Sequence, residues 1–351
     1  MTTNSAPFVR PLSLGELLDQ AIRLYRSKFL TLVGVIAIPY LPLVLLQGLS
    51  SYLMLSSVSD FASSANPFES YGYWGGLAGT YLTLFLQFFL VNGIGAAALT
   101  RVAADAYTQR PTGIVEAYRS VGANFGRVVG AMFALAAAFL AVFIWVMVPC
   151  VGWVTGVGVI FFVSIIVVPL TIPVVMLERQ GGFGAIRRAW DLGRSRFWWM
   201  LGFAFVLSLL GQLLVTIPVM LINYGLGLLF AGQFDFEQTA ILSSLLSSLT
   251  GAASGLLYVP LSLTAMVVAY FDLRVRSEGL DLALQAASQT DPEANIATLA
   301  ETTPSAPQGN FATGTDVLNF FLLSLIFGLL YALLFGAVFL FLFGMGATMG
   351  L

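Results

Sequence analysis

The chain has 351 residues, of which 58% are apolar and only 9% charged, and its mean hydropathy is +0.91. This composition excludes a soluble globular domain and predicts a polytopic membrane protein. The formal net charge is only -2, but the fifteen Lys and Arg residues all fall between apolar runs that would lie on one side of a membrane. That side is locally basic and favours anionic lipid as its neighbour.

Apolar runs bounded by charged or turn residues predict seven transmembrane helices, and therefore an all-α, polytopic helical bundle. Several of the runs exceed the roughly 20 residues that a bilayer requires, so tilting or kinking is expected. Prolines within four of the runs support kinking. Such kinks either shape the bundle or act as hinges. The expected spans are approximately 29–55, 75–103, 127–148, 152–177, 197–230, 239–272 and 317–349.

The distribution of charge predicts the orientation of these spans. Short loops with Lys and Arg alternate with loops that have no base, and basic loops face the cytoplasm. The first apolar run begins near Phe29 and is too long for a cleavable signal peptide, so we expect it to act as a signal anchor. We therefore predict a multi-pass protein of the cell membrane, with a cytoplasmic N-terminus and, after seven spans, an extracytoplasmic C-terminus.

The segment before the first span has the pattern of an amphipathic helix. Ser13 and Glu16 have the spacing of a capping box, and Asp19 precedes Arg23 by four residues, which favours an ion pair. Apolar residues recur on the opposite face. We expect this helix to lie flat at the interface, with its apolar face in the headgroup region.

This basic segment recurs along the chain. Residues 21–29 align without gaps on residues 189–197, and a weaker copy runs through Ala117, Arg119, Phe125 and Gly130. The chain is therefore interpreted as three parallel repeats, each an interfacial helix followed by a transmembrane hairpin. The repeats would cover about 13–105, 112–178 and 183–285 and form a six-span membrane domain, 1–285.

The remainder of the chain differs in composition. Residues 286–315 are rich in Ala, Thr, Ser, Pro and Gln and predict a disordered cytoplasmic linker, either a passive tether or a segment that binds a partner. Residues 316–351 predict an appended seventh helix, which we expect to pack outside the six-span domain.

Several kinds of chemical site are not apparent in the sequence. There is no histidine, one cysteine, Cys150, and one lysine, Lys28, so the usual catalytic bases and metal ligands are missing. We expect no enzyme activity and no cofactor or metal, and no feature suggests nucleic-acid binding.

Two groups of residues are candidates for function. The first consists of bases in or beside the amphipathic segments, as contacts for anionic lipid headgroups or as topological anchors. They are Arg23, Arg26, Lys28, Arg119, Arg187, Arg188, Arg194, Arg196, Arg274 and Arg276. The second consists of polar residues within spans, which either line a cavity or form interhelical hydrogen bonds. They are Gln87, Asn92, Gln212 and Asn223.

Three stretches of the chain, residues 10–19, 187–202 and 270–281, carry a resemblance to a known family. The last, Tyr-Phe-Asp-Leu-Arg-Val-Arg-Ser-Glu-Gly-Leu-Asp, is the most specific, since a plain apolar span has no reason to end in alternating acids and arginines. The chain resembles the glycerophosphoryl diester phosphodiesterase membrane-domain family over about residues 8–285. The resemblance implies a standalone membrane domain without the catalytic barrel.

These features favour a non-enzymatic membrane scaffold, or a module that interacts with anionic lipids and membrane-protein partners through its basic face. The alternative is a transporter or lipid-handling protein with a cavity between the repeated hairpins.

Overall fold

A computed structural model describes residues 11–63, 66–107, 112–230, 236–283, 286 and 309–349. All regular elements within these ranges are helical, and seven helical stretches are long and apolar enough to cross a membrane. The all-α membrane bundle is therefore confirmed. The seven stretches are Phe29–Ser63, Tyr71–Tyr107, Phe125–Val146, Val151–Leu177, Phe197–Phe230, Ile241–Glu278 and Gly314–Gly336.

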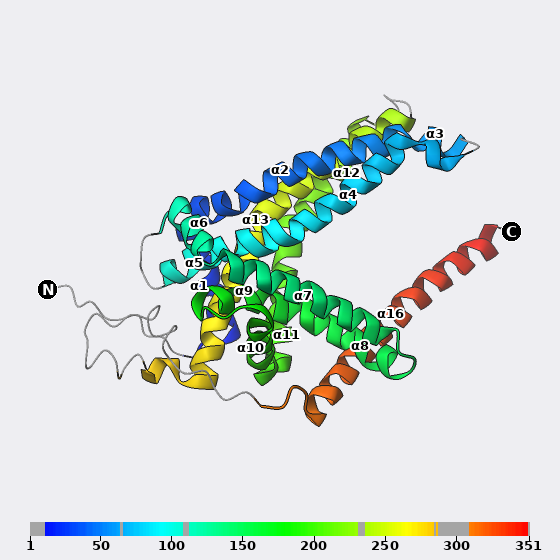
Figure 1. The fold of residues 1–351 in the computed structure, drawn as a ribbon. Coiled ribbons are helices and arrows are strands. Elements are labelled where there is room, and N and C mark those ends of the chain that lie inside the picture. The colour runs from blue at the N-terminus through cyan, green and yellow to red at the C-terminus, as the bar shows by residue number, and fades with distance from the viewer. Residues whose placement is uncertain are drawn as a thin grey trace.

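The first half of the chain forms two hairpins with their preceding short helices (Figure 1). The elements are α1 (Leu14–Ser27), α2 (Phe29–Ser56), α3 (Val58–Ser63), η1 (Pro67–Glu69), α4 (Tyr71–Phe89), η2 (Leu90–Gly95), α5 (Ala96–Tyr107), α6 (Ile114–Ala123), α7 (Phe125–Val146), α8 (Val151–Phe162), η3 (Val163–Val167) and α9 (Val168–Leu177).

The second half contains a third hairpin and a separate last helix. The elements are α10 (Gly182–Ser195), α11 (Phe197–Gly211), η4 (Gln212–Thr216), α12 (Ile217–Phe230), α13 (Phe236–Glu278) and α16 (Gly314–Met349).

Three spans contain a π-helical segment, η2, η3 or η4, at which the helix continues without a break. Two of these segments end two residues before a proline: η3 ends at Val167, before Pro169, and η4 ends at Thr216, before Pro218. Proline removes one backbone donor, and a π-type turn accommodates the changed hydrogen bonding. The first span instead keeps Pro39 and Pro42 inside a single helix.

The bundle has two distinct ends. Helices α1, α6 and α10 lie at one end, whereas α3, the α7–α8 turn, the end of α12 and the start of α13 lie at the other (Figure 1). The Lys and Arg residues that the structure describes lie on or beside α1, α6 and α10, on α5, at the start of α7, after the end of α9 and at the end of α13. We call this end the basic end and the opposite end the far end.

Each short helix joins its span through a single non-helical residue. Lys28 separates α1 from α2, Asn124 separates α6 from α7, and Arg196 separates α10 from α11. These three residues have similar backbone angles, with φ of -121°, -112° and -136°. The three hairpins therefore begin with the same local geometry.

The start of α1 agrees with the sequence prediction. The Ser13 amide donates to Glu16 Oε2 at 2.8 Å, and the Glu16 amide donates to Ser13 Oγ at 3.4 Å, which completes the capping box. The Asp19–Arg23 ion pair is also present.

The apolar faces of the short helices pack against protein rather than lipid. Leu17 and Ala21 of α1 are buried, as are Ala185 and Ala189 of α10. A Cβ atom on Gly193 of α10 would lie 2.6 Å from the side chain of Ile166 in η3, so α10 packs closely against the fourth span. The expectation that these faces enter the headgroup region is corrected, because they form part of the protein core.

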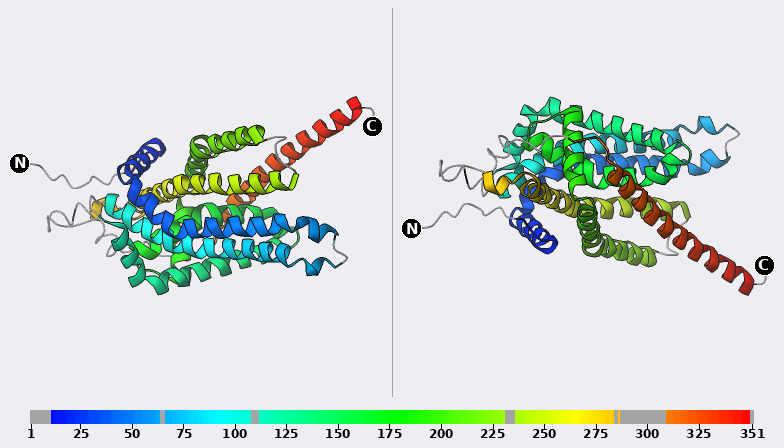
Figure 2. Two further views of the ribbon diagram at one scale, coloured as in Figure 1. Left: turned by 90° about the horizontal axis from the view of Figure 1, so that it is seen from above. Right: turned by 90° about the horizontal axis from the view of Figure 1, so that it is seen from below.

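The last helix packs on the second hairpin. The Gly158 amide of α8 donates to Ser324 Oγ of α16 at 2.8 Å, and the Phe161 and Phe327 rings stack with centroids 3.7 Å apart. Beyond this contact α16 diverges from the bundle (Figure 2).

Most of the expected linker lies outside the described residues, but its end does not. Residues 309–313 contact α10, where Trp190 Nε1 donates to the Phe311 carbonyl at 3.0 Å and the two rings stack. Arg194 Nη1 reaches Asp316 Oδ2 at 3.1 Å. The expectation of a disordered linker up to residue 315 is therefore corrected for this part.

Candidate functional site at the basic end

The three stretches that carry the family resemblance meet at the basic end. The Leu12 amide donates to Asp272 Oδ1 at 2.7 Å, and Arg276 Nη2 donates to the Leu12 carbonyl at 2.6 Å. Arg276 Nε also pairs with Asp272 Oδ2 at 2.9 Å. Residues 260 positions apart are thus joined, and the end of α13 binds the backbone of Leu12, just before α1.

The second and third stretches meet in a group of buried polar side chains. We call this group the buried ionic cluster, and it consists of Glu178, Arg188, Tyr270, Arg274 and Glu278. Arg188 lies on α10, Tyr270, Arg274 and Glu278 lie on α13, and Glu178 directly follows α9. The segment around α9 and α10 and the end of α13 therefore contribute to one site, although Glu178 and Tyr270 are 92 positions apart.

Hydrogen bonds connect all five members of the cluster. Tyr270 donates its hydroxyl hydrogen to Glu178 Oε1 at 2.8 Å, and Arg274 Nη1 donates to the Tyr270 oxygen at 3.2 Å. Arg188 Nε pairs with Glu178 Oε2 at 2.9 Å, and Arg274 Nε pairs with Glu278 Oε2 at 2.8 Å. Arg188 also pairs with Glu278, which closes the network.

The charges of the cluster balance, with two guanidinium groups against two carboxylates. The Glu178 and Glu278 side chains are 6% and 1% exposed, so neither is solvated to a useful extent. Burial lowers the pKa of Arg188, but its hydrogen bonds and charge interactions with Glu178 and Glu278 outweigh burial and raise the pKa above its ordinary value. Arg188 is a permanent cation.

The backbone next to the cluster has an unusual conformation. Arg179 has a φ of +55°, in the left-handed region that a residue with a Cβ rarely adopts. It directly follows Glu178, the C-cap residue of α9, so the left-handed turn ends the helix where glycine is more usual. The chain accepts this cost, about 1 kcal/mol, at the position that places Glu178 between α10 and α13.

Both carboxylates of the cluster bind guanidinium groups, so the cluster joins α10 and α13 to the end of α9. No group of three or more His, Cys, Asp or Glu that could hold a metal ion occurs among the described residues. A buried ion pair is costly to break from one side, because the remaining charge loses its partner. The cluster is therefore expected to fix α9, α10 and α13 in one arrangement.

The ten bases expected to contact headgroups fall into distinct classes. Arg188 and Arg274 are 4% and 1% exposed and belong to the cluster, so the expectation that they reach lipid is corrected. Four more have carboxylate partners: Arg23 with Asp19, Arg187 with Asp191, Arg194 with Asp191 and Asp316, and Arg276 with Asp272.

Four of the ten have no carboxylate partner among the described residues. We call them the unpaired cations, and they are Arg26, Lys28, Arg119 and Arg196. Arg26 and Arg119 are exposed, whereas Lys28 and Arg196 are partly exposed. The Arg196 guanidinium lies over the Trp199 ring, 5.0 Å from its centroid. Each of the three short helices therefore has at least one such cation on it or directly after it.

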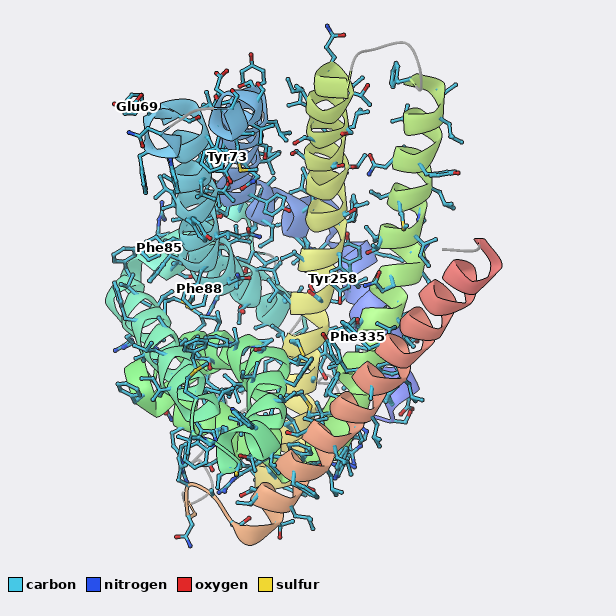
Figure 3. All side chains as sticks on the ribbon, turned by 90° about the vertical axis from the view of Figure 1, so that its right-hand side faces the viewer. Glu69, Tyr73, Phe85, Phe88, Tyr258 and Phe335 are labelled. Atoms are coloured by element: carbon cyan, nitrogen blue, oxygen red, sulfur yellow. The ribbon has the colours of Figure 1, made fainter. Side chains whose placement is uncertain are left out.

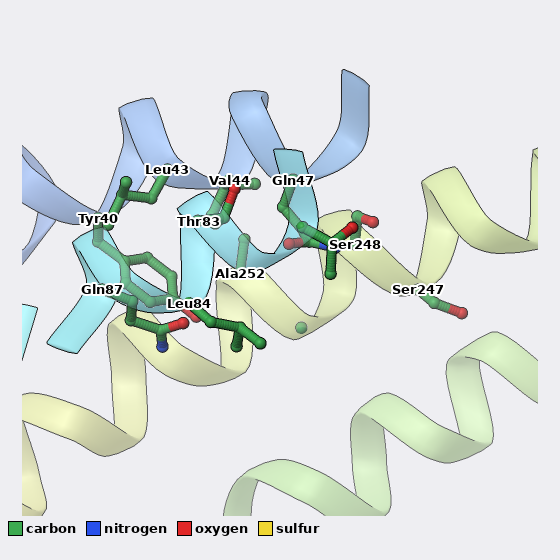
Figure 4. A pocket seen from close by; sticks show the side chains of 12 residues that line it. Tyr40, Leu43, Val44, Gln47, Thr83, Leu84, Gln87, Ser247, Ser248 and Ala252 are labelled. Carbon is green, nitrogen blue, oxygen red and sulfur yellow. The ribbon is translucent and has the colours of Figure 1, made fainter. Parts of the chain in front are cut away.

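The polar residues expected to line one cavity are not brought together. Gln87 lines a cavity of about 320 Å³ between α2, α4 and α13, with Gln47, Thr83, Ser247 and Ser248 (Figure 4). The other three lie elsewhere: Asn92 and Gln212 are exposed in η2 and η4, and Asn223 Nδ2 donates to Thr250 Oγ1 at 2.7 Å. The idea of one cavity lined by all four is wrong, and Asn223 instead joins α12 to α13.

Sequence reasoning missed Glu178 and Glu278 as partners of Arg188 and Arg274. Both glutamates stand at the end of an apolar span. From sequence alone, an acid at that position can equally be exposed to solvent or buried in an ion pair. Comparison with known proteins finds no matching protein family, no matching curated protein and no matching solved structure.

Proposed function

We propose that this chain is a non-enzymatic, multi-pass protein of the cell membrane that gathers anionic lipids at its basic end and serves as a membrane scaffold. The observation that carries this proposal is the set of unpaired cations, which the three short helices present at one end of the bundle. Membrane-protein partners would assemble on the same end.

The distinction between paired and unpaired bases makes the proposal specific. A guanidinium that already binds a carboxylate has fewer donors to offer a phosphate, and its charge is compensated locally. The unpaired cations keep both charge and donors. A Lys or Arg near an anionic surface contributes about 1 kcal/mol of attraction.

The proposal also includes the orientation, the repeats and the family. The basic end would face the cytoplasm, as the positive-inside rule requires. Each short helix is followed by one non-helical residue and then by its span, and this shared arrangement supports three parallel repeats. The contacts that residues 270–281 make with residues 10–19 and 187–202 support the family resemblance.

The proposal can be tested in native-like membranes. The variant with Arg26→Gln, Lys28→Gln, Arg119→Gln and Arg196→Gln is extracted with its surrounding lipid in a styrene–maleic acid copolymer, and phosphatidylglycerol is quantified by mass spectrometry. We expect the enrichment of phosphatidylglycerol over the bulk membrane to fall, because each lost charge weakens attraction about fivefold at 1 kcal/mol. Arg23→Gln is the control, since Arg23 is exposed but already paired. Equal enrichment in the four-site variant and the wild type would overturn the proposal.

A second candidate function is a transporter, and the 320 Å³ cavity is the observation that favours it. Gln87, Ser247 and Tyr40 line this cavity, so it suits a small neutral solute with hydrogen-bonding groups. Ser247→Cys in a Cys150→Ser background tests whether water reaches the site. The control is Ser254→Cys, because Ser254 does not line the cavity. Rapid reaction of Ser247→Cys with a charged methanethiosulfonate reagent would favour transport. Protection of Ser247→Cys from the reagent would count against transport.

A further inference from the structure

A second and larger cavity lies where the third hairpin meets the last helix. Its volume is about 680 Å³, and its walls come from η3, α9, α11, α13 and α16. The side chains that shape it are mainly large and apolar. They include Trp198, Phe205, Tyr258, Met266, Leu323 and Phe327.

The nature of these walls specifies a hydrocarbon occupant. The volume lies within the roughly 300–1,000 Å³ of small-molecule sites, and a mainly apolar lining cannot satisfy the hydrogen bonds of water. Phe205 is 64% exposed at the margin, so the cavity communicates with the surrounding bilayer. Protein interiors contain few voids larger than a water molecule, and lipid chains are available here to fill this space.

Glycines on α11 shape the walls of the cavity. Tyr258 lies on α13 beside α11 (Figure 3), and a Cβ atom on Gly211 would be only 2.1 Å from its ring. The absence of a side chain at Gly211 therefore lets the ring seat against α11. Gly202, also in the wall, faces open space, with no atom within 4 Å of an added Cβ.

One end of the cavity is close to the basic end. Trp198 at the start of α11 donates from Nε1 to Asn319 Oδ1 of α16 at 3.0 Å. Arg196, one of the unpaired cations, precedes Trp198 by two residues. Tryptophan is enriched where chains meet headgroups, and a guanidinium matches a phosphate.

We propose that this cavity is a binding site for a phospholipid, with one acyl chain between α11, α13 and α16 and the phosphate on the Arg196 side. The acyl-chain site stands independently of the proposed function, which bears only on the choice of an anionic headgroup.

The test uses phosphatidylglycerol with a photoactivatable diazirine in its acyl chain. The full-length protein is reconstituted with this probe, irradiated, and digested for peptide mapping. We expect adducts on the wall residues of α11, α13 and α16. Gly202→Leu should reduce these adducts to the level of the exposed face of α12, because Gly202 lines the cavity and an added Cβ there meets no atom within 4 Å, so the new side chain would occupy the cavity.

Gly225→Leu on α12 is the matched control, because Gly225 also faces open space and does not line the cavity. If Gly202→Leu fails to fold, Ser208→Leu fills the same cavity from a later turn of α11. Unchanged adducts in the filled variants, or crosslinks between two protein copies in their place, would overturn the site. Repeating the test with a phosphatidylcholine probe separates the two proposals: equal labelling by both probes keeps the acyl-chain site but contradicts an anionic headgroup.

Discussion

Leu12 and Asp272 lie 260 positions apart, yet the Leu12 amide donates to Asp272 Oδ1 at 2.7 Å. Asp272 has no side-chain exposure and also binds Arg276, so one carboxylate holds the approach to α1 and the end of α13 together. The approach to α1 is therefore anchored to the end of α13.

We predict that Asp272→Asn destabilises the protein by about 1–3 kcal/mol. The amide side chain retains one accepting oxygen, but it removes the charge that compensates Arg276 and leaves a buried group imperfectly paired. Thermal unfolding in detergent measures the loss. Asp19→Asn is the control, because Asp19 is 69% exposed in its pair with Arg23 and should change stability by less than about 1 kcal/mol. Equal losses of stability in both variants would contradict a stabilising role for the Asp272 contacts with Leu12 and Arg276.

The buried ionic cluster leads to a larger expected effect. Glu178→Gln should cost about 3–5 kcal/mol, because Arg188 and Arg274 would then share the charge of Glu278 alone. The double variant Glu178→Gln, Arg188→Met should lose less stability than the sum of the two single losses, because Arg188→Met removes the cation that Glu178→Gln leaves without a partner. Additive losses in the double-mutant cycle would show that the two residues act separately. Glu116→Gln on the exposed face of α6 is the control for loss of one acid.

The contact between α8 and α16 provides a third prediction. A Cβ atom on Gly158 would lie 2.2 Å from the Phe320 carbonyl oxygen, and backbone cannot move aside as a flexible side chain can. Gly158→Ala should therefore separate the two helices and break the Gly158–Ser324 hydrogen bond. Hydrogen–deuterium exchange should rise in peptides from α8 and from 314–328.

A matched control for this variant is Gly130→Ala on α7. An added Cβ meets no atom within 4 Å there, and alanine raises helix propensity equally at both positions. Unchanged exchange in α16 after Gly158→Ala would mean that the last helix is held by other contacts, such as the Phe161–Phe327 stack.

The helices could be predicted from sequence because their signals are local. Apolar runs located all seven spans, and the spacing of Ser13 and Glu16 located the start of α1. The interior of the basic end could not be predicted in the same way. Whether Arg188 points to lipid or to Glu178 depends on how α9, α10 and α13 pack, and periodicity within α10 does not contain that information.

The candidate cavities show the same limit. Gln87 and Gln212 are polar residues in apolar spans, and sequence alone cannot tell that one faces a cavity and the other the outside of the bundle. The 680 Å³ cavity has mainly apolar walls, so no polar residue signals it. Its shape follows from Gly202 and from α16, whose position no local pattern specifies.

The orientation of the chain can be tested with its single cysteine. Cys150 is exposed in the turn between α7 and α8 at the far end, opposite the basic end. If the basic end faces the cytoplasm, a membrane-impermeant maleimide added to intact cells should label Cys150 without permeabilisation. The reciprocal variant, Cys150→Ala with Ser27→Cys, places the thiol at an exposed position at the end of α1 and should react only after permeabilisation. Labelling of Ser27→Cys in intact cells, with Cys150 protected, would reverse the topology and place the unpaired cations outside, where the proposed attraction to cytoplasmic anionic lipid could not operate.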